Sequence, residues 1–247
     1  MQTGVAVVGR HVVGRHVVGP QTLIIDADDT LWENNIYFEQ AWAEFFEYLS
    51  HSSLTGEQAR SIFDEIEIAN IKVNGYGAKN FAKNMVTCYR HLVEREIAPG
   101  DVERVMSFAD RILRQPIEMM DGVEETLEYL LHRSHDLILF TKGEAEEQRL
   151  KIDRSPVGRY FRNFEIVREK DAEAYGELCV RFGFRSEVTW MIGNSPKSDI
   201  NPALEAGLNA VFVPHERTWT LEQTELREAG PGQLVVVEKF RDLQNIF

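Results

Sequence analysis

The sequence predicts an α/β protein with a parallel sheet, helices on the faces of that sheet, and a helical unit inserted near its start. Short apolar runs of strand type alternate with helix-like stretches along residues 116–247. This alternation is typical of parallel sheets, whose strands are joined by helical crossovers. By contrast, about a hundred residues between the first and second apolar runs carry helical patterns only. A crossover needs about a dozen residues, so most of that interval must be a separate unit.

The strand-like runs are four or five residues long, as buried strands often are. They occupy residues 22–25 (TLII), 137–140 (LILF), 164–167 (FEIV), 188–192 (VTWMI) and 210–213 (AVFV). Each of the last four runs follows a helix-like stretch. The order predicts a Rossmann-like core over residues 21–34 and 116–247.

Caps and apolar spacing place the helices of this core. Asp121 and Glu124 form a pattern like a capping box before the stretch VEETLEYLLH, whose apolar side chains share one face. Asp171 is the expected N-cap of the stretch DAEAYGELCVRFG. In INPALEAG, Pro202 stands early and Gly207 just past the end, which is the usual asymmetry of a helix.

Residues 35–115 are predicted to form a helical cap. Thr55 and Gln58 match the capping box that begins a helix. Three other stretches have apolar residues at helical spacing. These are Phe38, Trp42, Phe45, Phe46 and Leu49, then Phe81, Met85, Tyr89 and Leu92, then Val102, Val105, Met106, Ala109 and Leu113. The chain is expected to enter and leave the core close to the DADDT loop.

Composition and charge exclude several classes of partner. Apolar residues make up 43% of the chain, as in a globular protein, and the formal net charge is −13. Nucleic acid and anionic membranes are therefore not expected as partners, and no apolar run is long enough to span a membrane. Cys88 and Cys179 lie far apart without metal-ligand spacing, which favours a reduced, cytoplasmic protein.

The first twenty residues, 1–20, repeat the unit VVGRH. An arginine or histidine interrupts each apolar pair, so the sequence predicts no secretion signal. A repeat this short buries almost nothing. We therefore expect a poorly ordered leader outside the folded domain, with a short added strand as the alternative.

Polar side chains follow four of the predicted strands, at the points where those strands end. They are Asp26, Asp28, Thr141, Lys170, Asn194 and Asp199. In an open parallel sheet, ligands bind beyond the carboxyl ends of the strands, where the strand order reverses. The sequence therefore predicts one site made from carboxylates, an amide, a hydroxyl and an ammonium group.

The clustered carboxylates need a cation, because each would otherwise raise the pKa of the others. Only oxygen ligands stand near the loop, with no histidine or cysteine, and this favours Mg²⁺, with Lys170 as a second positive charge. A metal held by few carboxylates commonly binds a phosphate group. Asp26, the first residue after the strand, can then attack phosphorus and form an aspartyl-phosphate. Asp28 can protonate the leaving oxygen and later activate water.

Four motifs occur in a fixed order: DADDT at residues 26–30, Thr141 after a hydrophobic strand, Lys170, and GNSPKSD at residues 193–199. They resemble the four ordered motifs of the haloacid dehalogenase superfamily, and the resemblance covers nearly all of residues 22–247. The helical insert is similar to the cap of the large phosphatase branch of that superfamily. Within the branch, DDTLW, GYG and GNSPKSDINPALEAG resemble a set of bacterial hydrolases described only as phosphatase-like.

The resemblance implies a role for each matching residue. Asp26 would be the nucleophile and a Mg²⁺ ligand, and Asp28 would be the general acid and base, with its backbone carbonyl on the metal. Thr141 would hydrogen-bond the phosphoryl oxygens. Lys170 would hold the nucleophile and the developing negative charge. Asp199 would complete the metal site.

Three further positions in these motifs need comment. Thr30 would brace the loop and, with Thr141 and Lys142, bind the phosphate. Asn194 stands where many relatives carry aspartate, so the metal site holds one negative charge fewer and binds Mg²⁺ more weakly or through the amide oxygen. Asp29 stands where glycine is frequent. Aspartate tolerates unusual backbone angles, which makes Asp29 a turn residue with no catalytic part.

Other residues are also candidates for the site. The Thr141 hydroxyl is followed by Lys142 and Gly143 at a predicted helix start, which is a ready anion site. Lys142 and Lys197 are rival phosphate-binding cations. In the cap, NGYGAKN is glycine-rich and basic between two helices. Tyr76 and Lys79 in this stretch are expected to contact the substrate, and a simple interhelical loop is the alternative.

The function expected from these residues is that of a Mg²⁺-dependent phosphatase acting on a small phosphorylated metabolite. A haloacid dehalogenase would use Asp26 on carbon without a metal, but dehalogenases lack a carboxylate at the position of Asp28. A non-catalytic ligand-binding protein of the same fold and a phosphomutase are further alternatives. The sequence leaves the substrate and the oligomeric state open.

Overall fold

The structure is a computed structural model that describes residues 17–228 and 230–247. Most of the predicted leader, residues 1–16, lies outside the described residues. The chain divides into two compact units. One comprises the chain up to Glu33, Ile117–Lys142 and Ile152–Phe247, and the other comprises Asn34–Pro116 and Gly143–Lys151. No helix within the described part of the chain is long and apolar enough to cross a membrane.

The first unit is built on a six-stranded sheet in the order β3-β2-β1-β4-β5-β6, in which all paired neighbours are parallel. The strands are β1 (Thr22–Ile25), β2 (Asp136–Lys142), β3 (Asn163–Val167), β4 (Thr189–Gly193), β5 (Asn209–Phe212) and β6 (Leu234–Val236). The predicted α/β fold with a Rossmann-like parallel sheet is confirmed. The strand order reverses between β1 and β4, so a crevice is expected at the carboxyl ends of these two strands.

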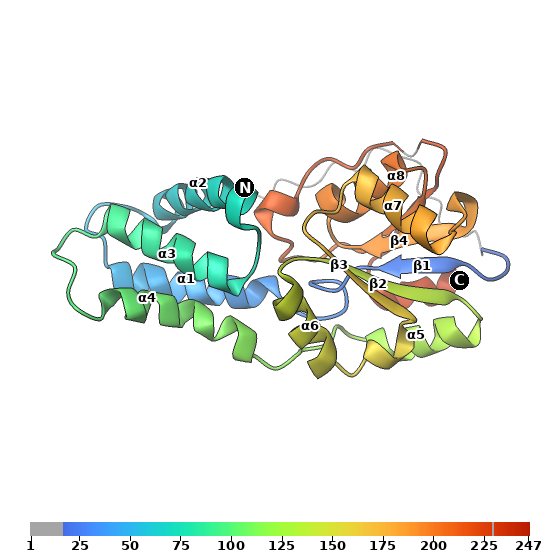
Figure 1. Ribbon diagram of the computed structural model, residues 1–247, viewed down its shortest axis with the longest axis horizontal. Coiled ribbons are helices and arrows are strands. Elements are labelled where there is room, and N and C mark those ends of the chain that lie inside the picture. Colours follow the sequence, from blue (N-terminus) through green and yellow to red (C-terminus); the bar gives the residue numbers. More distant parts are fainter. Residues whose placement is uncertain (1–16, 229) are drawn as a thin grey trace. The chain divides into compact units, whose positions relative to one another are not determined.

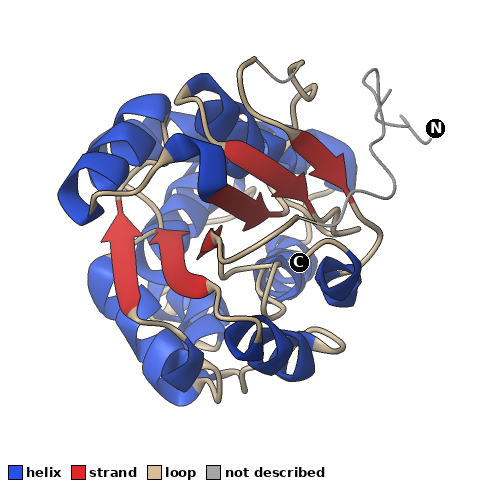
Figure 2. Ribbon diagram, turned by 90° about the vertical axis from the view of Figure 1, so that its right-hand side faces the viewer, coloured by secondary structure: helices blue, strands red, loops and turns tan. Residues whose placement is uncertain are grey.

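Helices cover both faces of this sheet (Figures 1 and 2). They are α5 (Val123–His132), α7 (Ala172–Phe182) and α8 (Asn201–Glu205). The strands alternate between the faces, as a period of two requires. Leu23 and Ile25 of β1 pack with α5 residues such as Leu127, whereas Ile24 packs with Leu178 of α7 and with α8. Both faces of β1 are therefore buried, which holds its carboxyl end in place.

The helix caps of this unit were predicted with mixed success. Asp171 caps α7, because its carboxylate accepts the Ala174 N–H at 2.8 Å. The predicted cap at Asp121 is wrong. Gly122 is the N-cap of α5, with a left-handed φ of 74° and no side-chain cap bond, while Asp121 forms an ion pair with Arg241. Gly122 adopts this left-handed conformation readily because it has no Cβ atom. The chain therefore turns into α5 without a side-chain cap from Asp121.

The second unit contains α1 (Asn35–Leu49), α2 (Gly56–Asn74), α3 (Ala78–Leu92), α4 (Asp101–Asp110) and most of α6 (Ala145–Arg154). The predicted capping box at Thr55 and Gln58 is present. Aromatic and aliphatic side chains at the predicted spacing form the core of the unit, including Phe45, Phe81 and Met85. Met106 is an exception: 40% of its surface is exposed, because it lies at the edge of the predicted apolar stripe of α4.

A buried carboxyl in this unit makes its stability depend on pH. Glu67 in α2 is buried, and its Oε2 has no hydrogen-bond partner among the described residues. Burial raises the pKa of Glu67 from 4.5 to about 7; Arg60 lowers it, and Asp64 and Glu39 raise it. Between pH 4.5 and about 7 the folded chain keeps a proton that the unfolded chain releases. Stability therefore falls as pH rises through this window.

Replacing Glu67 with glutamine should stabilise the protein at pH 8 and change its stability little at pH 4.5. At pH 8 the wild-type carboxyl is ionised where the charge is disfavoured, at a cost of up to about 3 kcal/mol, whereas glutamine carries no charge. Urea unfolding at both pH values measures the difference. Glu65→Gln, at an exposed position of the same helix, is the matched control. Equal effects of Glu67→Gln at the two pH values would contradict the prediction.

Candidate active site

The first carboxylate of the predicted site is fixed at the carboxyl end of β1. Asp26 follows β1 directly, and its backbone N–H donates to the Ile192 carbonyl of β4 at 2.9 Å. Its side chain is buried, and only 6% of the residue is exposed. Three residues on, Asp29 has a φ of 60°, in the left-handed region. That conformation agrees with its prediction as a turn residue.

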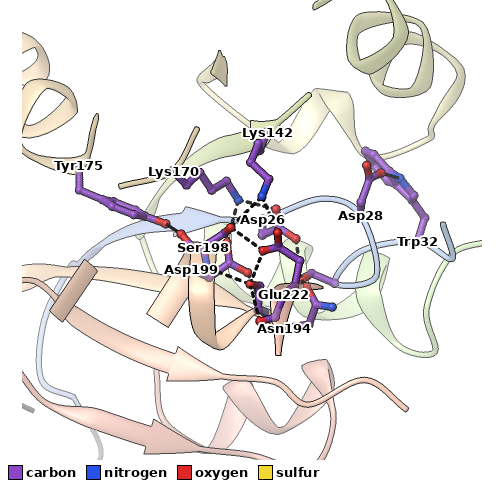
Figure 3. Close-up of polar contacts among 12 residues, drawn as sticks. Asp26, Asp28, Trp32, Lys142, Lys170, Tyr175, Asn194, Ser198, Asp199 and Glu222 are labelled. Atoms are coloured by element: carbon purple, nitrogen blue, oxygen red, sulfur yellow. Dashed lines mark hydrogen bonds and ion pairs between the residues drawn. The ribbon is translucent and has the colours of Figure 1, made fainter. Parts of the chain in front are cut away.

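Lys170 lies between two carboxylates that follow different strands, Asp26 after β1 and Asp199 after β4 (Figure 3). Its Nζ donates to Asp26 Oδ1 at 2.5 Å and to Asp199 Oδ1 at 2.8 Å, and all three side chains are buried. Burial alone would lower the pKa of Lys170, but Asp199 and Asp26 raise it to about 12. The ammonium is therefore a permanent positive charge beneath the predicted nucleophile.

One ammonium does not neutralise two buried carboxylates. Burial and the neighbouring Asp199 raise the pKa of Asp26 from 3.8 to about 7, although Lys170 lowers it, and Asp28 adds a smaller upward effect. Like charges so close together disfavour ionisation unless a further cation is bound. The charge balance of the site therefore favours binding of a cation beside Asp26 and Asp199.

The turn after β4 places Asp199. The backbone N–H of Ser195 donates to Asp199 Oδ2 at 2.9 Å, and the turn continues through Pro196–Ile200. Gly193 is required by this packing, because a Cβ atom at that position would lie 2.3 Å from Asp199 Oδ2. Tyr175 supports the same turn from α7 by donating its hydroxyl to the Ser198 carbonyl at 3.0 Å. The carboxylate is thus held by its own turn as well as by Lys170.

Thr30 and Asn194 complete the group around Asp26. The Thr30 hydroxyl lies 3.0 Å from Asp26 Oδ2 and 3.2 Å from Asn194 Oδ1, within donating distance of both. On its other side, the Asn194 Nδ2 donates to the Thr218 hydroxyl at 3.0 Å. Both Thr30 and Asn194 are buried. The structure therefore brings Asp26, Asn194 and Asp199 together, as the strand-end argument predicts.

Asp28 points away from this group in the structure. Its Oδ1 accepts the Trp32 indole N–H at 2.7 Å, and Figure 3 shows the two side chains apart from the Asp26 and Lys170 contacts. A proton-transfer role for Asp28 thus requires a rotation of its side chain toward the reacting group.

Thr141 is buried near the carboxyl end of β2, which pairs with β1.

Glu222 is a residue of the site that the sequence analysis missed. Its Oε1 accepts the Lys142 ammonium at 2.6 Å, and its Oε2 accepts the hydroxyls of Ser195 and Ser198. Lys142 also donates to Ser198 Oγ at 2.8 Å. Burial alone would raise the pKa of Glu222, but Lys142 and the serine hydroxyls hold it below its usual value. Glu222 lies in the short helix Thr220–Glu222, where no periodicity or motif marks it.

A histidine does lie near the DADDT loop in the folded chain, contrary to the expectation from the sequence. In the segment after β5, His215 places Nδ1 4.0 Å from Asp29 Oδ1 and Nε2 3.5 Å from Glu33 Oε2. Only β4 separates β1 from β5 in the sheet, which the linear sequence does not reveal. Both ring nitrogens face these two carboxylates, and the side chains beside Asp26 that could be cation ligands, Asn194 and Asp199, offer oxygen atoms.

Tyr76 and Lys79 belong to the helical unit, in and after the loop between α2 and α3. The Glu147 carboxylate accepts the backbone N–H groups of Ala78 at 2.8 Å and Lys79 at 3.3 Å, and so caps the start of α3. Gly77 leaves room for it, because a Cβ atom there would lie 2.7 Å from Glu147 Oε2. The Lys79 side chain is mostly exposed, and its Nζ lies 3.8 Å from Glu146 Oε2. A substrate contact by Tyr76 or Lys79 stays a prediction.

Comparison with known proteins identifies relatives of this chain. A pyrimidine 5'-nucleotidase, PynA of Streptococcus pneumoniae, is 29% identical over 110 residues, which are 42% of this chain and 46% of that protein. The chain thus matches less than half of that relative's length. A haloacid dehalogenase-like family hydrolase from Xanthomonas campestris has a TM-score of 0.73 at 29% identity, covering 87% of this chain and 91% of that one.

A second solved structure, the HAD-hydrolase YfnB from Bacillus subtilis bound to magnesium, shares the fold. Its TM-score is 0.64 at 18% identity, with 92% of this chain and 97% of that chain covered. Dehalogenases and a phosphoglycolate phosphatase identified by prediction also occur among solved structures of this fold. The family model of the haloacid dehalogenase-like hydrolases matches residues 20–207. The chain therefore belongs to the family of haloacid dehalogenase-like hydrolases.

Proposed function

We propose that this hydrolase is a Mg²⁺-dependent phosphatase that cleaves a phosphomonoester of a small metabolite through an aspartyl-phosphate at Asp26. The observation that carries the proposal is the surroundings of Asp26. Its carboxylate is buried, bound by Lys170 and Thr30, and followed two residues later by a second carboxylate, Asp28. The nucleotidase among the relatives supports phosphate ester chemistry.

The donor set fits Mg²⁺. Asp26 and Asp199 supply carboxylate oxygens, Asn194 an amide oxygen and Asp28 a backbone carbonyl, and Mg²⁺ prefers oxygen ligands of these kinds. The pKa of Asp26 is raised although Lys170 is bound to it, which indicates that a further cation would stabilise the ionised carboxylate. When bound, the ion would neutralise the carboxylates and polarise the phosphoryl oxygens.

The side chains of the site can perform two successive displacements. Asp26 attacks phosphorus, and the bond to the leaving oxygen breaks as Asp28 delivers a proton to that oxygen. Asp28 then removes a proton from water, which attacks the phosphorus of the aspartyl-phosphate and releases phosphate with Asp26 restored. Lys170 holds the negative charge that develops on the phosphoryl group, and Thr141 and Lys142 bind its oxygens.

Haloacid dehalogenation is the second candidate, because dehalogenases share this fold. The same Asp26 would attack carbon, and a halide would leave without a proton. A carboxylate at position 28 has no task in that reaction, whereas an alkoxide leaving group requires one. We therefore favour the phosphatase over the dehalogenase, and the pair of carboxylates at Asp26 and Asp28 favours an enzyme over a non-catalytic binding role. Free thiols at Cys88 and Cys179 support a reduced, cytoplasmic location.

Phosphate release from a panel of phosphorylated metabolites tests this function. The panel should contain pyrimidine nucleoside monophosphates, sugar phosphates, phosphoamino acids and a generic aryl phosphate, each with Mg²⁺ and with chelator. We expect release that requires Mg²⁺ and that is strongest for one class of ester. Halide release from 2-haloacids in the presence of chelator is assayed in parallel. Halide release without any phosphate release would replace the phosphatase with a dehalogenase.

A further inference from the structure

We propose that Thr218 is a positioning residue that turns the Asn194 amide so that its oxygen, and not its nitrogen, faces the cation site. The inference rests on the proposed Mg²⁺ site. A carboxylate offers oxygen at both ends, but an amide offers one oxygen and one NH₂ donor. At Asn194 the orientation of the amide therefore decides whether the side chain can be a ligand.

The two ends of the Asn194 amide have different surroundings. Its Oδ1 lies 3.2 Å from the Thr30 hydroxyl, which is also 3.0 Å from Asp26 Oδ2. Its Nδ2 donates to Thr218 Oγ1 at 3.0 Å. The oxygen thus lies on the side of the nucleophile, and the nitrogen points to the segment after β5. Asn194 and Thr218 are both more than nine-tenths buried, so water competes little for these contacts.

Thr218 is an acceptor toward Asn194 because its own proton is engaged elsewhere. Its Oγ1 donates to the His215 carbonyl at 3.0 Å, and its backbone N–H donates to the same carbonyl at 3.1 Å. With the proton directed there, the lone pairs of Oγ1 face the Asn194 side chain. They attract the NH₂ group and repel the carbonyl oxygen.

The contact with Thr30 does not by itself fix the orientation of the Asn194 amide. A reversed amide would place NH₂ against the Thr30 oxygen, which can accept a hydrogen bond while its proton goes to Asp26. Both orientations are therefore compatible with Thr30, and the contact with Thr218 selects between them. The same segment after β5 also brings Glu222 to the hydroxyls of Ser195 and Ser198. It therefore supports the turn that carries Asp199 as well as the Asn194 side chain.

Mg²⁺ binding to the full-length chain, measured by titration calorimetry in the absence of substrate, tests the role of Thr218. Thr218→Val keeps the shape of the side chain and removes the acceptor, so we expect Mg²⁺ binding weakened by about tenfold or more. Thr218→Ser keeps the hydroxyl and should bind Mg²⁺ as the wild type does. Thr218→Ala is the second variant without an acceptor, and thermal melting in chelator checks that each variant is folded.

The same comparison in an Asn194→Asp background separates orientation from general support. A carboxylate presents oxygen whichever way it is turned, so Thr218→Val should not weaken Mg²⁺ binding there. Equal weakening in both backgrounds, or unchanged binding by both Thr218→Val and Thr218→Ala, would overturn the proposal. Absence of Mg²⁺ binding by the wild type would overturn it together with the metal site. If Mg²⁺ binds but no phosphate ester is cleaved, only the proposed function fails, and the Thr218 comparison still decides this inference.

Discussion

Replacing Asp26 with asparagine should abolish hydrolysis and leave the chain folded. The amide has nearly the same shape but is not a nucleophile, and loss of a catalytic nucleophile lowers turnover by at least about 10⁴-fold. Lys170 keeps Asp199 as its partner at 2.8 Å, so the variant retains a balanced ion pair. Because the raised pKa of Asp26 reflects an unfavourable charge, the metal-free variant should be at least as stable as the wild type at pH 8.

Phosphate release and thermal melting of the same preparation measure the two effects of Asp26→Asn. Mass spectrometry must establish that the asparagine has not deamidated, because aspartate would restore the enzyme. Asp28→Asn is the informative comparison. It keeps the nucleophile and should slow both displacements without removing turnover entirely. Full activity of a verified Asp26→Asn preparation would rule out the aspartyl-phosphate mechanism.

Replacing Lys170 with methionine should both inactivate and destabilise the protein. The substitution leaves Asp26 and Asp199 buried beside each other without the ammonium that now binds them. Removing one partner of a buried ion pair typically destabilises a protein by about 3–5 kcal/mol. The loss should be largest above pH 7, where Asp26 of the wild type is ionised and needs the ammonium. It should be smaller at low pH, where protonation of Asp26 relieves the repulsion.

Urea unfolding in chelator measures the effect of Lys170→Met. Lys197→Met is the matched control: Lys197 lies in the same site region but donates to the Leu221 carbonyl at the surface, so its loss should change stability by less than about 1 kcal/mol. The double variant Asp26→Asn with Lys170→Met should recover part of the lost stability, because only one buried carboxylate remains. A Lys170→Met protein as stable as the control would contradict the charge balance described above.

The sheet and much of the candidate site could be predicted because both follow from the position of residues at strand ends. Asp26, Asn194 and Asp199 stand next to short apolar strands, and parallel strands bring their carboxyl ends to one edge. The strand β6 was missed, since it has three residues and no helix-like pattern precedes it. The N-cap at Asp121 was misplaced by one residue because Gly122 makes the turn.

The parts of the site that could not be predicted come from the irregular segment after β5. Thr218 and Glu222 reach Asn194 and Lys142 across 24 and 80 residues of sequence. A hydroxyl and a carboxylate in such a segment carry no periodicity, so nothing local distinguishes them from surface residues. Their partners become evident only when the parallel order of β1, β4 and β5 is known.

The position of β1 in the sheet has a consequence for biosynthesis. This strand leaves the ribosome before the other five strands of the described sheet, but both of its neighbours, β2 and β4, follow α1–α4 in the chain. The contacts within α1–α4 are local and can form early, whereas β1 must wait for distant partners. The carboxylates after β1 acquire Lys170 only after β3 has been made, and Thr218 and Glu222 follow only after β5. A nascent chain that stalls before residue 218 would therefore carry a folded helical unit and an incomplete active site.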